Sequence, residues 1–310
     1  MTEAGGVRGT RGAPDIRRAI DWGTLGPLRL RARAVAEGVY AGMHRSARRG
    51  AGVEFGGYRE YSPGDDLRWL DRRSLLRHER LVVRQFETET DRALRLVVDA
   101  TSSMAYRGAR APGAKLAWCA LVSAALARIA LASGDPVGLA FIGGETPRTI
   151  PKGAGREQFE RIVASLEAVA PGGDATLDPA LLGRTLEALV RTVRRGNILV
   201  VLSDLLDLPP NADQTIAALA SQGRVLVVVQ TLDPDEASFP FEGTVRLRAM
   251  EGPFVVETDA DTTRARYLDA LELLRERWER AVTRRGGRFL RVTTSDDPVR
   301  AVRQIVEAAR

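Results

Sequence analysis

The sequence predicts an α/β fold with a Rossmann-like, doubly wound, mainly parallel sheet. The first observation is a set of short apolar runs, at Leu94–Asp99, Asn197–Leu202 and Arg224–Gln230, which are typical of strands buried on both faces. The second is that helical segments separate these runs, as crossovers between parallel strands require. The third is that polar residues follow the apolar runs directly, at the sheet edge where open α/β folds bind ligands.

The first part of the chain predicts a smaller, separate region of helix and strands. Residues 1–14 are rich in Gly and Arg, and we expect them to form a disordered tail. A helix is expected over Leu28–Arg48 and a strand over Arg80–Glu87. The predicted organisation is therefore this tail, an N-terminal region over 15–90, and the α/β domain over 91–310.

Within the α/β domain, the hydrophobic periodicity predicts alternating strands and helices. The remaining expected strands are Val137–Ile142, an edge piece at Arg148–Pro151, a weaker β region over Thr244–Glu257, and Arg288–Thr293. The expected helices are Lys115–Ala132, Arg156–Val169, Pro179–Arg194, Asp213–Gln222, Arg264–Arg284 and Pro298–Ala309.

Composition narrows the function classes. The only cysteine is Cys119, so no intramolecular disulfide can form. With only two histidines besides, a structural zinc site has almost no ligands. The net charge of +6 is spread along the chain and aromatic residues make up only 5%, which argues against nucleic-acid binding. We see neither a secretory signal nor an apolar run of about 18 residues that would span a membrane, and we expect a cytoplasmic location.

The residues that follow the expected strands carry oxygen ligands. Asp99, Thr101 and Ser103 follow the first strand, and alternation past its end points them the same way. Asp204 follows the NILVVL strand, and Thr176 lies in the loop PGGDATLD between two helices. Two carboxylates with hydroxyls and water are suited to a hard cation such as Mg²⁺. Taken alone, the first three residues favour a turn whose side chains cap the backbone over a metal site.

Together these residues resemble the metal-ion-dependent adhesion site of von Willebrand factor A domains. Asp99, Thr101 and Ser103 match its first motif, Thr176 its second and Asp204 its third. The first motif usually has serine where this chain has Thr101, which offers the same hydroxyl oxygen with an extra methyl group. The resemblance implies a von Willebrand factor A-like domain that holds Mg²⁺, Mn²⁺ or Ca²⁺ and captures an acidic group of a protein partner.

The segment before this domain narrows the resemblance. The run EFGGYREYSPGDDLRWLD over Glu54–Asp71, followed by VRQFETETD and VVDATSSM, resembles the bacterial domain of unknown function 58 family. The chain departs from that pattern at Asp71-Arg72, where the family often has Asp-Trp. The resemblance implies a non-enzymatic adaptor or partner of a MoxR-type AAA+ ATPase, acting in chaperone-like assembly or maturation of a client.

The alternative from another class is a metal-dependent phosphatase of the haloacid-dehalogenase type, in which Asp99 would be the nucleophile. The second acid of that motif is absent, because Thr101 stands in its place. We therefore expect an interaction module rather than an enzyme.

Overall fold

The computed structural model describes residues 20–46, 57–60, 82–85, 92–174, 178, 180–206, 208–250 and 255–310. The chain divides into two compact units, one formed by 1–39 with 92–310 and the other by 40–91. In the second unit, β1 (Gly57–Glu60) pairs antiparallel with β2 (Val82–Gln85). The expected tail over 1–14 and most of the Glu54–Asp71 segment lie outside the described residues, so the expected three-part division stays a prediction.

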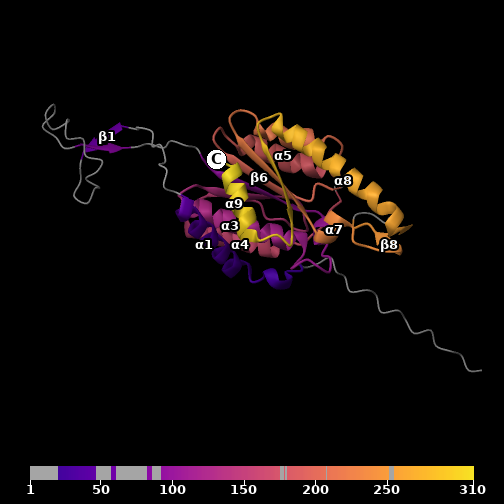
Figure 1. Ribbon diagram of the computed structural model, residues 1–310. Helices are drawn as coiled ribbons and strands as arrows, with labels where there is room; N and C mark the ends of the chain where they lie inside the picture. Colours follow the sequence, from indigo (N-terminus) through magenta and orange to yellow (C-terminus); the bar gives the residue numbers. More distant parts are fainter. Residues whose placement is uncertain are drawn as a thin grey trace, which may run out of the picture. The chain divides into compact units, whose positions relative to one another are not determined.

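A six-stranded sheet is the centre of the larger unit (Figure 1). Its order is β10-β7-β6-β3-β4-β5, with only the edge strand β5 antiparallel to its neighbour. The chain thus winds outward from β3 in both directions, as the doubly wound prediction required. The strands are β3 (Leu94–Ala100), β4 (Val137–Gly143), β5 (Ile150–Gly153), β6 (Ile198–Ser203), β7 (Val225–Leu232) and β10 (Arg288–Thr293).

Helices cover both faces of this sheet (Figure 1). On one face lie α1 (Leu28–Ser46), α3 (Lys115–Ala132), α4 (Gly155–Ala168) and α9 (Pro298–Ala308). On the other lie α5 (Ala180–Thr192), α6 (Ala212–Ala217) and α8 (Ala260–Thr283). Short elements complete the unit: η1 (Gly23–Leu25), η3 (Ser102–Ala105), η4 (Ala218–Ala220), α7 (Pro234–Ser238), and the antiparallel pair β8 (Thr244–Arg248) and β9 (Val255–Asp259).

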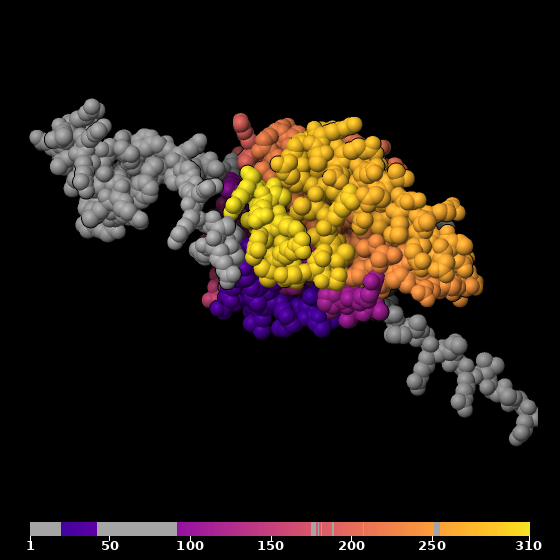
Figure 2. Space-filling model, in the orientation of Figure 1, coloured from indigo at the N-terminus to yellow at the C-terminus, as the bar shows by residue number. Residues whose placement is uncertain are grey.

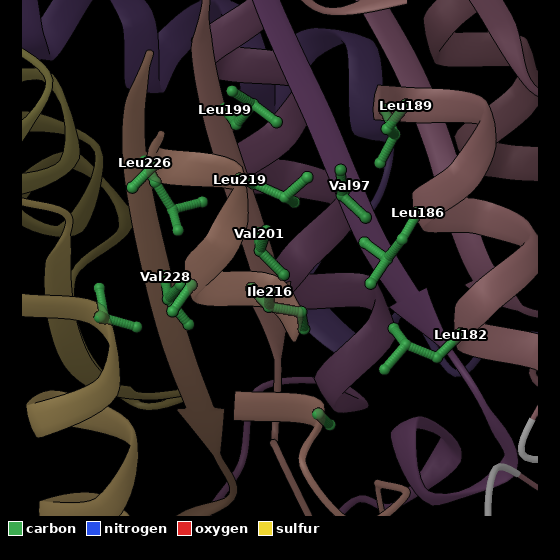
Figure 3. Close-up of a cluster of buried hydrophobic side chains, with 14 of the residues drawn as sticks. Val97, Leu182, Leu186, Leu189, Leu199, Val201, Ile216, Leu219, Leu226 and Val228 are labelled. Carbon is green, nitrogen blue, oxygen red and sulfur yellow. The ribbon is translucent and has the colours of Figure 1, made fainter. Parts of the chain in front are cut away.

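The core between the sheet and α5 shows why this segment is a helix. Leu182, Leu186 and Leu189 recur at helical spacing and form one row along α5, facing Val97 of β3 and Val201 of β6 (Figure 3). All five side chains are buried. Burying a leucine contributes about 1.5–3 kcal/mol, so this row fixes α5 on the sheet.

Helix α3 is apolar around most of its circumference because other elements cover most of it. Its 18 residues have a mean hydropathy of 1.6, enough by length and composition to cross a membrane, contrary to the expectation that no such segment exists. Yet 78% of it is buried inside the fold, where it packs against the sheet, α4 and α9. A helix that is apolar all round is expected in such a core.

The C-terminal helix α9 lies beside α1 on the surface, where the yellow and indigo segments adjoin (Figure 2). A Cβ atom at Gly38 of α1 would come within 3.0 Å of a Val299 side-chain carbon on α9. The glycine therefore allows the two helices to approach closely.

The structure confirms the predicted elements within the described residues to about two residues at most ends, with three differences. Helix α8 starts at Ala260, before the expected Arg264. The expected helix Asp213–Gln222 is the short α6 followed by the 3-10 turn η4. The weak β region is a hairpin-like pair outside the main sheet.

Candidate functional site

The register of the sheet brings two strand ends together. Val98 of β3 pairs with Leu202 of β6, so Asp99 and Ser203 come next on adjacent strands. From β3 the chain crosses to β4 on one side and from β6 to β7 on the other, so this is the switch point in strand order. Ligands of open α/β sheets bind in the crevice at such a point.

Asp99 is the fully buried centre of a hydrogen-bond cluster. Its Oδ1 accepts from the backbone N–H of Thr101 at 2.9 Å and from Thr101 Oγ1 at 2.8 Å. Its Oδ2 accepts from Ser203 Oγ at 2.6 Å. Burial, followed by the negative charge of Asp204, raises the pKa of Asp99 to about 6 despite these donors. Among the described residues, no ion pair supplies this carboxylate with compensating positive charge.

Thr101 and Ser103 place their hydroxyls next to that carboxylate. Both residues are buried, and their oxygens lie 3.1 Å apart. Two ligands at adjacent corners of a magnesium octahedron, each about 2.0–2.1 Å from the ion, are separated by roughly 2.9 Å. The Asp99–Thr101 and Thr101–Ser103 oxygen separations, 2.8 and 3.1 Å, match that spacing.

Asp204 is also fully buried, and its carboxylate is held by a lysine. Its Oδ1 accepts from the backbone N–H of Leu206 at 2.9 Å, and its Oδ2 accepts from Lys115 Nζ at 2.8 Å. The same ammonium donates to Glu236 Oε1 at 2.6 Å. Burial alone would lower the pKa of Lys115, but the charges of Asp204 and Glu236 outweigh it and raise that pKa. Lys115 thus stays charged.

The short helix α7 positions Glu236. Asp233 caps this helix and accepts from Asp235 N at 2.8 Å, while Glu236 Oε2 accepts from Asp233 N at 2.9 Å. This reciprocal pair is a capping box, which fixes the first turn. Asp233 also accepts from Gly108 N at 2.7 Å, so α7 is joined to the segment that follows Ser103.

The loop that carries Thr176 begins beside the cluster. Ser102 donates to Gly173 O through its backbone N–H and its hydroxyl, both at 3.0 Å, and Gly172 N donates to Ala100 O at 2.8 Å. Gly143 adopts φ +69°, and a Cβ there would lie 2.9 Å from Gly172 O, so the close approach requires glycine. Thr176 itself lies outside the described residues, and its role stays a prediction.

Four of the five predicted site residues are thus described. Asp99, Thr101 and Ser103 share one hydrogen-bond cluster, and Asp204 directly follows Ser203, which joins that cluster. Reasoning from the sequence missed Ser203, Lys115 and Glu236. The signal for Glu236 was present as D-P-D-E, an N-cap followed by proline and a capping glutamate. Lys115 gave no local signal, because it opens an otherwise apolar helix. In the described part of the chain, no three His, Cys, Asp or Glu side chains group as a metal cluster, so any metal would depend on the hydroxyls.

The fold and site define a class of protein: an α/β domain with a buried carboxylate and hydroxyl cluster at the switch point of its sheet. Residues 57–277 match the family described as "Protein of unknown function DUF58", and the chain belongs to that family.

The chain is also similar to curated proteins and solved structures. The uncharacterized proteins Rv1480 of Mycobacterium tuberculosis and Mb1516 of Mycobacterium bovis are each 30% identical over 240 residues, covering 76% of this chain and 73% of theirs. A conserved hypothetical protein, BatB, from Bacteroides thetaiotaomicron is 19% identical with a TM-score of 0.46, over 69% of this chain and 97% of its own. An aerotolerance-related membrane protein from Bacteroides fragilis is 19% identical with a TM-score of 0.45, over 70% and 98%.

Proposed function

We propose that this chain is a non-enzymatic, metal-dependent protein-interaction module of the von Willebrand factor A type. In this proposal Asp99, Thr101 and Ser103, with Thr176 and Asp204, hold Mg²⁺, or Mn²⁺ or Ca²⁺ in its place. The observation that carries the proposal is the spacing of the Asp99, Thr101 and Ser103 oxygens, which suits adjacent corners of an octahedron. When bound, the ion supplies an open coordination position for an acidic group of a partner.

The charges of the site support a divalent cation. Among the described residues, the ammonium of Lys115 pairs with the carboxylates of Asp204 and Glu236, and the neighbouring buried carboxylate of Asp99 forms no ion pair. With all four groups ionised, the sum is two negative charges, which one divalent ion balances. Because buried uncompensated charge is costly, the site is better satisfied with such an ion than without it.

Lys115 also bears on how Asp204 would contribute. One oxygen of Asp204 accepts a hydrogen bond from Lys115 and the other from a backbone N–H. Both carboxylate oxygens of Asp204 are therefore already hydrogen-bonded. Asp204 would therefore act on the ion through a water molecule, as magnesium sites with few protein ligands commonly do. The direct ligands would be Asp99 and the hydroxyls.

For the partner, we propose a MoxR-type AAA+ ATPase and its client. The support is the likeness of the segment around Glu54–Asp71 and the site motifs to the family pattern, which implies chaperone-like assembly or maturation. The chemistry of capture would be a carboxylate of the partner completing the coordination of the ion.

The test is a pull-down with the purified full chain and a MoxR-type ATPase from the same genome, in Mg²⁺ and in EDTA. Capture in Mg²⁺ that is lost in EDTA and in Asp99→Ala supports the proposal. Asp269→Ala is the matched control, because Asp269 is an exposed carboxylate on α8, away from the cluster. Equal capture by the Asp99 variant would contradict the proposal.

The phosphatase alternative has its own test. In that mechanism Asp99 would attack a phosphorus atom, yet both of its oxygens already accept hydrogen bonds from Thr101 and Ser203. Turnover of p-nitrophenyl phosphate that requires Mg²⁺ and disappears in Asp99→Asn would replace the interaction proposal with an enzymatic one.

A further inference from the structure

A cavity of about 670 Å³ lies beside the start of β3, between α5 and the β4–β5 edge of the sheet. This volume falls within the range of about 300–1,000 Å³ that is common for small-molecule sites. All its described lining residues belong to the larger unit of the chain. It contains none of the residues of the Asp99 cluster.

The floor of the cavity holds a buried arginine that has no acidic partner among the described residues. Arg95, the second residue of β3, is only 7% exposed, and it forms no ion pair with any described residue. Its Nη2 makes one long hydrogen bond, 3.4 Å, to Thr192 O at the end of α5, and its Nε has no partner within the described structure. Burying a charge is costly unless it is paired and hydrogen-bonded, so the described residues satisfy this guanidinium only in part.

Gly138 of β4 makes room for that guanidinium. It pairs with Arg95 in the sheet register, and a Cβ added to it would lie 2.5 Å from Arg95 Nη1. The same Cβ would lie 3.2 Å from Ile150 O and from Lys152 N of β5. The guanidinium therefore rests over a glycine, directed toward the sheet edge that borders the cavity.

The rest of the lining combines apolar walls with a positive rim. The polar lining is the smaller part, and Leu139, Phe141 and Leu189 are among the apolar residues. Of the described lining residues, five are Lys or Arg and none is Asp or Glu. Of the rim arginines, Arg184 is paired with Asp178. Figure 3 shows Leu189 at the end of the α5 leucine row nearest the start of β3.

We propose that this cavity binds a small organic anion with an apolar body, whose carboxylate pairs with Arg95. A planar carboxylate matches the two-pronged guanidinium, and the apolar walls would cover an acyl or aryl body. Lys152, Arg191 and Arg194 at the rim would favour the approach of an anion.

This site is separate from the Asp99 cluster. Arg95 and Asp99 are four residues apart on one strand, about 13 Å at the usual rise of a strand. The cavity lies toward the start of β3 and the cluster at its end. Binding to the cavity should therefore need no metal, so its test is independent of the proposed function.

The experiment is calorimetric titration of the full chain with sodium octanoate, with acetate and octanamide as comparison probes. Octanoate should bind saturably, whereas octanamide, which lacks the charge, and acetate, which lacks the apolar body, should bind at least tenfold more weakly. Arg95→Met should weaken octanoate binding at least tenfold, and EDTA should leave it unchanged. Arg128→Met is the matched control, because Arg128 lies on α3 over the Phe159 ring and does not line the cavity.

A second variant keeps the test decisive if Arg95→Met does not fold. Arg191→Glu with Arg194→Glu changes only exposed rim positions, and it should weaken octanoate severalfold, more at low salt. The proposal is overturned if octanoate shows no saturable binding, if it binds Arg95→Met or the rim variant as tightly as the natural chain, or if acetate binds as tightly as octanoate.

Discussion

In the metal-free protein, the buried charge of Asp99 lowers the free energy of unfolding, and a single substitution should remove this destabilisation. Asp99→Asn takes away the buried negative charge and its repulsion with Asp204. The asparagine oxygen can still accept both hydrogen bonds from Thr101, and its amide can donate to Ser203 Oγ, which already accepts from Leu205 N. The substitution therefore changes charge with little change in packing.

The size of this effect follows from the pKa. Burial and Asp204 raise the pKa of Asp99 from 3.8 to about 6, and each pKa unit corresponds to about 1.4 kcal/mol. The folded protein thus holds the Asp99 proton to a higher pH than the unfolded chain. The contribution of Asp99 to stability falls as pH rises from about 4 to about 6, by about 3 kcal/mol, and stays low above that window.

The assay is urea unfolding followed by circular dichroism, in EDTA, from pH 4 to pH 8. We expect Asp99→Asn to be about 1–3 kcal/mol more stable than the natural chain at pH 8, with a difference that shrinks toward pH 4. Added Mg²⁺ should stabilise the natural chain but not the variant. A variant that is less stable at pH 8 in EDTA, or a difference that is constant with pH, would refute the reasoning.

Three further predictions follow from the buried groups. Lys115→Met removes the counter-charge that Lys115 gives Asp204 and Glu236, so it should lower the free energy of unfolding in urea by about 3–5 kcal/mol in EDTA and by less in Mg²⁺. An equal decrease in both conditions would show that the metal does not replace the charge of Lys115. Cys119 is fully buried and burial raises its pKa to about 12, so Ellman's reagent at pH 8 should label it only after unfolding; rapid labelling of the native chain would contradict this burial. Leu186→Ala should lower the free energy of unfolding in urea by about 2–5 kcal/mol while Mg²⁺ binding persists. Loss of Mg²⁺ binding in the folded variant would show that α5 packing controls the site.

The sheet was predictable because its central strands are largely apolar and helical segments separate them. Val97 and Val201 occur in such runs, and the leucines of α5 recur at helical spacing. The doubly wound class of the sheet was predictable but its strand order was not, because the sequence does not show which strands pair. Helix α7 was missed because five residues are too few to show a hydrophobic period.

The site was predictable where it depends on strand ends and unpredictable where it depends on distant pairing. Asp99, Thr101 and Ser103 follow one strand, so alternation alone predicts that they converge. Lys115 meets Asp204 across 89 positions and Glu236 across 121, and only the folded chain brings these together. Arg95 gave no signal either, because one arginine in an apolar strand shows neither its burial nor its lack of an ion pair with any described residue.

The most direct test of the central claim, a metal held by Asp99 and the two hydroxyls, is a titration of chelator-stripped protein with Mn²⁺, followed by electron paramagnetic resonance. The double variant Thr101→Val with Ser103→Ala removes two oxygen ligands without changing charge, and Asp269→Ala is the control. We predict one saturable site in the natural chain and in the control, weakened at least tenfold in the double variant and in Asp99→Asn. Equal Mn²⁺ binding by all four proteins, or none by the natural chain, would contradict the account.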